Sequence, residues 1–172
     1  MASGRKYEMK FFTATILEWK YLLTNDLYKD IITGSMKFFA DNNRVQLYTF
    51  AIMNNHRHLL WDIIHPNKRE DIQRDFLRFT SHMIVKDLKK NNPELLNVFY
   101  VGAKDREYQV GERNPLSVPV WSEEVLKQKL NYIHNNPVKT GLCHYAEDYK
   151  YSSAAIYHGL ASEWDFVTLC VF

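Results

Sequence analysis

Apolar and polar positions follow two different periods along the 172-residue chain, and each period predicts a type of element. Residues 10–17, KFFTATIL, are rich in aromatic and β-branched side chains and predict a strand. Behind a cap at Asn25-Asp26, apolar residues recur at helical spacing and predict a helix that ends near residues 41–43. The apolar face of this helix consists of Leu27, Ile31, Ile32, Met36 and Phe39.

The next segment predicts a β-hairpin. Residues 45–53 and 56–64 both have strand-like composition, and Asn54-Asn55 between them suits a tight turn. Pro66-Asn67 then ends the second of these strands.

The remaining elements are two helices with a strand between them. The first helix is expected over about residues 70–90, and residues 98–110 contain the predicted strand. Residues 111–119 predict an irregular loop. Ser122 caps the last helix, which is expected to end at Asn136 because a proline follows and disfavours helical geometry in the residue before it.

The predicted order is strand, helix, strand, strand, helix, strand, helix, within one domain that spans residues 1–172. The first six elements match a split βαβ, or ferredoxin-like, arrangement. This is an α+β fold in which two helices pack on one face of an antiparallel sheet. The C-terminal helix is additional, and the other face of the sheet is free to build a site with it.

Composition restricts the class of protein. Hydrophobic residues make up 46% of the chain and aromatic residues 15%, which favours a folded globule over disorder. The formal net charge is only +2, so contact with DNA would require a local basic patch. Cys143 and Cys170 form no metal motif or disulfide framework. No apolar stretch reaches membrane-spanning length, and we expect a soluble cytoplasmic protein without a membrane partner.

His56 and His58 are the first candidates for chemistry. On a strand, residues i and i+2 point to the same face, so both imidazoles can be offered to one divalent cation. This spacing also arises by chance, and the alternative interpretation is a pair of ordinary strand histidines, one of them in the core. The context favours a metal site, since the pair opens a strand directly after a tight turn.

Tyr132 and Asn136 are the second candidates. They are four residues apart and share one face of the last helix, so a phenol and an amide oxygen lie side by side. The alternative is a half-buried packing tyrosine and a helix-capping asparagine. A tyrosine with a pKa of about 10 is a poor nucleophile unless it is activated, and a nearby cation supplies that activation. Together the two motifs predict metal-assisted attack on a phosphodiester.

Basic residues lie near both motifs. Solvated surface charge is the default explanation for each of them, and contact with DNA is the functional one. They are Arg57 between the histidines, Arg74 and Arg78 on the second helix, and Lys127, Lys129 and Lys139 around Tyr132.

Three segments together resemble the REP-associated tyrosine transposases, which are single-tyrosine HUH transposases of bacterial insertion sequences. The segments are NNHRHLL (54–60), YIHNNPVKTGL (132–142) and EDYKYSSA (147–154). The resemblance extends over residues 10–157, and the order and spacing of the motifs make it specific.

The resemblance implies a domain that cleaves and rejoins single-stranded or hairpin DNA through a 5′-phosphotyrosine intermediate. Tyr132 would be the nucleophile, and His56 and His58 the HUH ligands of the metal. Asn136 would be the third ligand, where many relatives use glutamine. Mg²⁺ or Mn²⁺ is the expected ion, because imidazole with hard oxygen ligands suits both.

The resemblance also bears on residues around this centre. Gln109 matches a glutamine common in relatives and is expected to contact DNA or a loop. Lys129 and Lys139 are expected to contact DNA because of their position near Tyr132, independently of the resemblance. His134 lies two residues from Tyr132, about 200° around the helix axis, and is expected behind the metal ligands or in packing. Relatives act as monomers or as dimers that exchange the tyrosine helix, so a homodimer is possible.

Arg57 departs from the family pattern, in which a hydrophobic residue separates the two histidines. It should point to the opposite face of the sheet, where an unpaired guanidinium would cost roughly several kcal/mol unless it reaches solvent. Arg57 therefore favours one alternative function, a domesticated module that binds a DNA hairpin without turnover. A second alternative is a metal-dependent nuclease in which water replaces Tyr132.

Overall fold

A computed structural model describes residues 9–172 of the chain. Its centre is a four-stranded antiparallel sheet in the order β2-β3-β1-β6. The strands are β1 (Lys10–Thr15), β2 (Val45–Ile52), β3 (His56–Ile63) and β6 (Leu116–Pro119). This is the strand order of the split βαβ arrangement, and the predicted ferredoxin-like class is confirmed.

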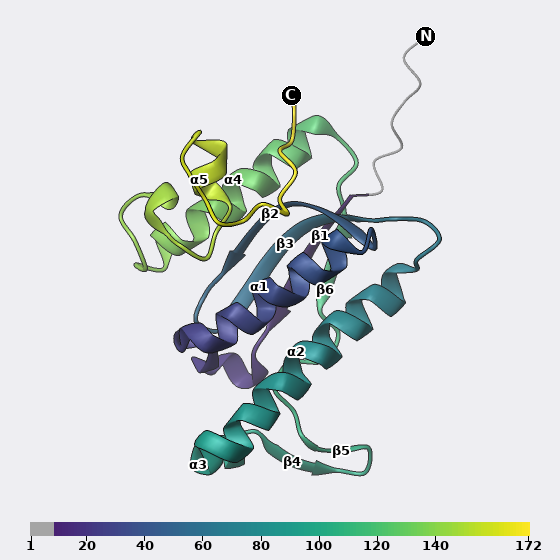
Figure 1. Cartoon of the computed structure of the whole chain (residues 1–172), viewed down its shortest axis with the longest axis vertical. Coiled ribbons are helices and arrows are strands. Elements are labelled where there is room, and N and C mark those ends of the chain that lie inside the picture. The colour runs from purple at the N-terminus through teal and green to yellow at the C-terminus, as the bar shows by residue number, and fades with distance from the viewer. Residues whose placement is uncertain (1–8) are drawn as a thin grey trace.

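Helices cover both faces of the sheet (Figure 1). α1 (Asp26–Asp41) and α2 (Arg69–Asn91) lie next to each other on one face, and α4 (Glu123–Lys139) lies on the other face. The predicted layers, two helices on one face and an additional C-terminal helix, are therefore present. None of the helices within residues 9–172 combines the length and the apolar character that crossing a bilayer requires.

The alternation of side chains along the strands explains why both faces are covered. Phe12 and Trp61 belong to the larger core under α1 and α2, whereas Phe11 and Leu60 belong to a smaller core under α4, together with Ile133. Burying each such side chain contributes about 1.5–3 kcal/mol, so neither face can be left open to water. The smaller core fixes α4 above the sheet.

Residues 98–110 do contain a strand, as predicted, but it does not belong to the main sheet. Residues 98–110 form a separate hairpin of β4 (Tyr100–Ala103) and β5 (Arg106–Tyr108), which follows the short helix α3 (Pro93–Asn97). The fourth strand of the main sheet is β6, inside the segment predicted to be a loop. β6 has four residues and ends at Pro119, which is tolerated on an edge strand, and so short a segment shows no clear strand period.

The predicted end of the last helix was wrong. α4 continues through Pro137 to Lys139 instead of ending at Asn136. An internal proline removes one backbone hydrogen bond, but here only the last turn lies beyond it. The Thr140 N–H donates to the Asn136 carbonyl at 3.0 Å and closes this turn, and Pro137 itself is buried. The extra turn holds Asn136 in helical geometry, on the same face as Tyr132.

The chain leaves β1 earlier than predicted. β1 ends at Thr15, and the chain turns through the 3-10 helices η1 (Leu17–Trp19) and η2 (Leu22–Thr24) into α1. Trp19 has a positive φ of 57°, and its ring packs 5.7 Å from that of His56. This turn therefore forms a wall beside the first histidine.

The segment after α4 covers the open edge of β2. It contains η3 (Ala146–Asp148) and α5 (Ala154–Tyr157). The Tyr151 carbonyl accepts a hydrogen bond from β2 at 2.9 Å, and the Thr168 N–H donates one to β2 at 2.8 Å. An uncovered edge strand would be open to pairing with another chain, and these contacts close much of it.

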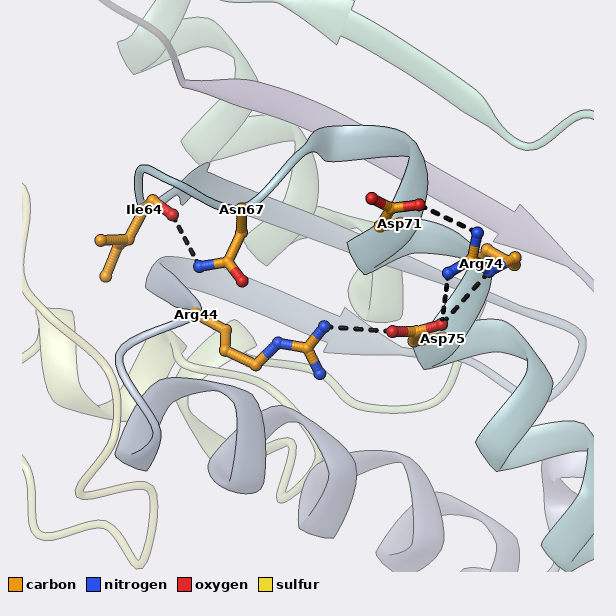
Figure 2. A network of polar contacts seen from close by, with 6 residues as sticks. All are labelled: Arg44, Ile64, Asn67, Asp71, Arg74 and Asp75. Carbon is orange, nitrogen blue, oxygen red and sulfur yellow. Dashed lines mark hydrogen bonds and ion pairs between the residues drawn. The ribbon is translucent and has the colours of Figure 1, made fainter.

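A polar network joins α2 to the start of β2 (Figure 2). Arg44, just before β2, donates to the Asp75 carboxylate at 3.0 Å. Arg74 donates to the same carboxylate and, at 2.9 Å, to Asp71 one turn earlier. The charge of Arg74 is therefore balanced within its own helix.

Candidate active site

The β2–β3 hairpin brings His56 and His58 together on the face of the sheet that α4 covers. Their ring centroids are 4.8 Å apart, and both side chains are buried. Thr13 Oγ1 lies 2.7 Å from His58 Nδ1, and Asn55 Oδ1 lies 2.6 Å from His56 Nδ1. Because Nδ1 of each ring is engaged, Nε2 is the atom that each ring would offer to a ligand, and Nε2 of His58 contacts the Asn136 side chain.

Tyr132 and Asn136 on α4 lie against this pair. The Tyr132 ring centroid is 5.2 Å from that of His58 and 5.9 Å from that of Phe11. The Asn136 side chain is buried, with Nδ2 3.4 Å from His58 Nε2. The structure thus brings together, within one chain, the two motifs that the sequence separates by more than seventy residues.

Burial keeps both imidazoles neutral. It lowers the pKa of His56 below its usual value, and it lowers the pKa of His58 to about 3, with smaller contributions from His56 and Lys129. A neutral imidazole is the form that binds a metal ion, whereas a protonated ring offers no lone pair. The pair is therefore in the correct state to bind a cation at neutral pH.

A divalent cation fits the donor set. Within residues 9–172, no cluster of three or more His, Cys, Asp or Glu side chains could hold a metal, so an ion bound by the two histidines would need a third ligand of another residue type. Asn136 Oδ1 is buried without a hydrogen bond of good geometry, although Asn136 is close enough to His56 to oppose the lowering of its pKa by burial. An ion held by His56, His58 and Asn136 would satisfy this atom and leave coordination positions for a phosphate.

Tyr132 is the exposed member of the site. Its side chain is 45% exposed, while His56, His58 and Asn136 are each at most 9% exposed. The phenol is therefore open to a substrate from outside, while the residues suited to a metal lie in the wall behind it. An exposed phenol beside three buried side chains is suited to a nucleophile that becomes bonded to a large substrate.

Of the predicted DNA contacts on α4, only Lys129 is placed in the site. Lys129 Nζ lies 4.5 Å from the centroid of the Phe11 ring, and its charge acts on His58. Lys139 is exposed in the last turn of α4, seven residues after Tyr132 and so on a similar face. Contact of either lysine with DNA stays a prediction.

Gln109 does not lie with Tyr132. Its side-chain oxygen accepts from the Arg106 guanidinium at 2.6 Å, and its amide donates to the Gly111 carbonyl at 2.9 Å. It lines a pocket with Arg57, on the α2 side of the sheet. Gln109 stabilises the loop between β5 and β6. Its contact with DNA stays a prediction, and it would occur at this pocket and not beside Tyr132.

Arg57 points away from the histidines, as strand geometry requires. Its side chain is only 5% exposed, and its guanidinium carbon lies 5.4 Å from the centroid of the Phe76 ring. Burial lowers the pKa of Arg57 to about 10, so the group is still charged at neutral pH. The expectation that Arg57 reaches bulk solvent at the start of β3 is wrong, and the expectation of a buried guanidinium is the correct one.

His134 anchors α4 to the sheet. Its Nε2 lies 2.7 Å from Thr49 Oγ1 on β2 and 2.8 Å from Ser153 Oγ, and the two hydroxyls are 2.6 Å apart. Burial lowers the pKa of His134 to about 4, so the ring is neutral. Among its contacts within residues 9–172, none is to the three residues suited to a metal, which gives His134 a packing role.

We expect His134→Ala to lower the free energy of unfolding by about 2–3 kcal/mol, because it leaves a cavity and removes a partner of two buried hydroxyls. Urea unfolding measures the loss. Asn135→Ala, on the exposed side of the same turn, is the control and should change stability by no more than about 0.5 kcal/mol. Equal losses in the two variants would contradict the anchoring role.

Two residues that orient the histidines were not identified from the sequence. Thr13 pairs with His58 across β1 and β3, and Asn55 was assigned only to the turn. Alternation along β1 puts Thr13 on the same face as Phe11, but the partner of Thr13 depends on strand register. Register becomes visible only when the strands are paired.

Several solved structures resemble this fold, including the following two. A REP-associated tyrosine transposase bound to a REP hairpin aligns over 100% of this chain and 95% of its own, with a TM-score of 0.66 and 16% identity. A Deinococcus radiodurans R1 protein assigned as a transposase is 18% identical, over 78% of this chain and 97% of its own, with a TM-score of 0.47. No family model and no curated protein matches the sequence. The first likeness shows that this chain has the fold of a tyrosine transposase.

Proposed function

We propose that this protein is a metal-dependent strand transferase for single-stranded or hairpin DNA, of the single-tyrosine HUH type. The observation that carries the proposal is the position of the exposed Tyr132 phenol beside the buried, neutral pair His56 and His58, with the buried Asn136 Oδ1 next to them. DNA as the substrate is supported by the structural neighbour, which is bound to a REP hairpin.

In the proposed reaction, Tyr132 Oη attacks a phosphorus of the DNA backbone. The Oη–P bond forms as the bond from phosphorus to the 3′ oxygen breaks, and the proton lost by the phenol is balanced by the one gained by the leaving 3′-hydroxyl. The 5′-phosphate stays on Tyr132 until a DNA 3′-hydroxyl reverses the step. One phosphodiester replaces another, so no nucleotide cofactor is needed.

His56, His58 and Asn136 would hold Mg²⁺ or Mn²⁺, which supplies Lewis-acid polarisation of the scissile phosphate when it is bound. Thr13 and Asn55 fix the orientation of the two imidazoles, so that little reorganisation is needed on binding. Lys129, whose Nζ lies over the Phe11 ring and whose charge acts on His58, adds a positive charge to the site that would attract a phosphate.

A single experiment separates this proposal from its alternatives. A labelled hairpin with single-stranded flanks is incubated with protein and Mn²⁺ and run on a denaturing gel. A strand transferase gives a covalent protein–DNA adduct together with a shortened strand. A nuclease that uses water gives free product without an adduct. A binding module, the alternative that Arg57 favours, gives only a shift on a native gel.

We expect the protein to bind a hairpin with single-stranded flanks more tightly than a plain duplex of matched sequence. With a net charge of +2, few phosphates can be neutralised, so the slope of log K against log salt should be modest, roughly −2 to −4 for three to five contacts. Titrations of both DNAs at several salt concentrations measure preference and slope. Tighter binding to the duplex would count against the proposal.

We further propose that one chain is sufficient for cleavage. α4 places Tyr132 beside the histidines of its own sheet, so exchange of the tyrosine helix with a second copy is not needed to complete the site. Cross-linking together with the adduct assay tests this, since a monomer that forms adducts would support it.

A further inference from the structure

The face of the sheet opposite to the histidines carries a pocket whose lining includes several charged side chains. Its volume is about 590 Å³, and it lies between the start of β3, α2 and the loop from β5 to β6. Its lining contains five arginines but only two acidic residues. These are Arg57, Arg74, Arg78, Arg106 and Arg113, against Asp105 and Glu112.

Three of the five arginines are already paired. Arg74 is held by two carboxylates of its own helix (Figure 2). Arg106 and Arg113 share Asp105, at 2.8 and 3.7 Å. Glu112 accepts a hydrogen bond from a backbone N–H of η1 at 2.6 Å. The acidic residues of the lining are thus engaged with groups other than Arg57 and Arg78.

Arg57 and Arg78 are the uncommitted charges. Within residues 9–172 neither side chain makes a hydrogen bond or an ion pair, and Arg57 Nε is buried without a partner. Arg57 is 5% exposed, while Arg78 is exposed at the rim of the pocket. Among residues 9–172, the Phe76 ring is the contact that stabilises the Arg57 charge, and buried polar groups are nearly always hydrogen-bonded, so the two arginines are suited to bind an anion.

We propose that this pocket binds a phosphate group of the DNA on which the protein acts, with Arg57 at its base and Arg78 at its rim. The inference rests on the proposed function. A guanidinium presents a planar fork of N–H donors that matches the oxygens of a phosphate. One phosphate would satisfy Arg57 Nε and balance the two free charges together.

The position of the pocket suits a DNA strand that also reaches Tyr132. Arg57 lies between His56 and His58 on β3, so the pocket and the candidate active site are back to back at one end of the sheet. Ala14 and Thr15, which pair with Arg57 and His56, line the pocket at that end. A single strand of DNA that passes around the end of the sheet would place one phosphate in this pocket and another beside Tyr132.

The test uses the full chain in EDTA, so that no cleavage occurs and the result does not depend on strand transfer. Binding of a labelled hairpin with single-stranded flanks is titrated against salt for Arg57→Met, Arg78→Gln and Arg69→Gln. Arg69→Gln is the matched control, because Arg69 lies on α2 outside the pocket and is paired with Glu70. Calorimetry with inorganic phosphate and with pyrophosphate forms a second arm.

We expect Arg57→Met and Arg78→Gln each to weaken DNA binding about tenfold and to reduce the salt slope by about 0.7, while the control stays within about twofold of the unmodified protein. Arg57→Met should have a Tm at least as high as that of the unmodified protein, since an apolar side chain of similar length replaces an unpaired buried charge. The exposed Arg78→Gln variant carries the test if Arg57→Met fails to fold.

Calorimetry with inorganic phosphate and pyrophosphate distinguishes a DNA phosphate from a free phosphorylated molecule as the ligand of the pocket. If inorganic phosphate or pyrophosphate binds only when Arg57 is present, and DNA affinity is unchanged in both pocket variants, the pocket binds a free phosphorylated molecule and the assignment to DNA is overturned. If Arg57→Met and Arg78→Gln match the unmodified protein in both arms, the pocket binds no phosphate. If Arg57→Met weakens DNA binding but the unmodified protein forms no adduct, the phosphate site is supported and the strand-transfer mechanism is contradicted.

Discussion

Tyr132→Phe is expected to abolish the covalent protein–DNA adduct, lowering cleavage of a hairpin substrate by at least about 10⁴-fold. The substitution removes only the phenolic oxygen. The ring contacts with His58 and Phe11 are retained, and the side chain is 45% exposed, so stability should change by no more than about 0.5 kcal/mol. DNA affinity and Mn²⁺ affinity should stay close to those of the unmodified protein.

The matched control for this variant is Tyr145→Phe. Tyr145 is 65% exposed and lies beyond the end of α4, so its loss of a hydroxyl should leave adduct formation unchanged. Denaturing gels with labelled hairpin DNA measure both variants. An adduct that persists in Tyr132→Phe would identify another nucleophile. Cleavage without an adduct in the unmodified protein and in Tyr132→Phe would favour the nuclease that uses water.

The parts of the fold that could be predicted from sequence depend on local periods. The β2–β3 hairpin, α1 and α2 each have a long, regular apolar pattern, and together with β1 and the strand expected in residues 98–110 their order predicted the split βαβ arrangement. The candidate site was predictable for the same reason. The i, i+2 spacing of His56 and His58 and the i, i+4 spacing of Tyr132 and Asn136 each fix a common face without any knowledge of tertiary structure.

The features that were not predicted depend on tertiary contacts. β6 is a strand because it pairs with β1, and neither its four residues nor Pro119 shows this in advance. α4 passes Pro137 because the last turn is closed beyond it and the proline is buried. The pairing of Thr13 with His58 depends on register. The isolation of Arg57 could be recognised only once the helices that cover it were in place.

The second large effect is expected at the proposed metal ligands. The double variant His56→Ala, His58→Ala should lose Mn²⁺ binding altogether, since only Asn136 is left to hold the ion. Asn136→Ala should weaken binding about tenfold or more, because it removes one of three ligands. Calorimetry or the electron paramagnetic resonance of free Mn²⁺ measures these affinities without DNA, so the result does not depend on cleavage.

Asn136→Asp and His134→Ala make this test specific. A carboxylate in place of the amide adds a negative charge next to two neutral imidazoles, so Asn136→Asp should bind Mn²⁺ more tightly than the unmodified protein. His134→Ala should keep its Mn²⁺ affinity while losing stability, because His134 Nε2 is engaged by Thr49 and Ser153. Equal loss of Mn²⁺ in His134→Ala and Asn136→Ala would contradict the assignment. It would mean that Mn²⁺ affinity depends on the packing of α4 and that Asn136 Oδ1 is not a metal ligand.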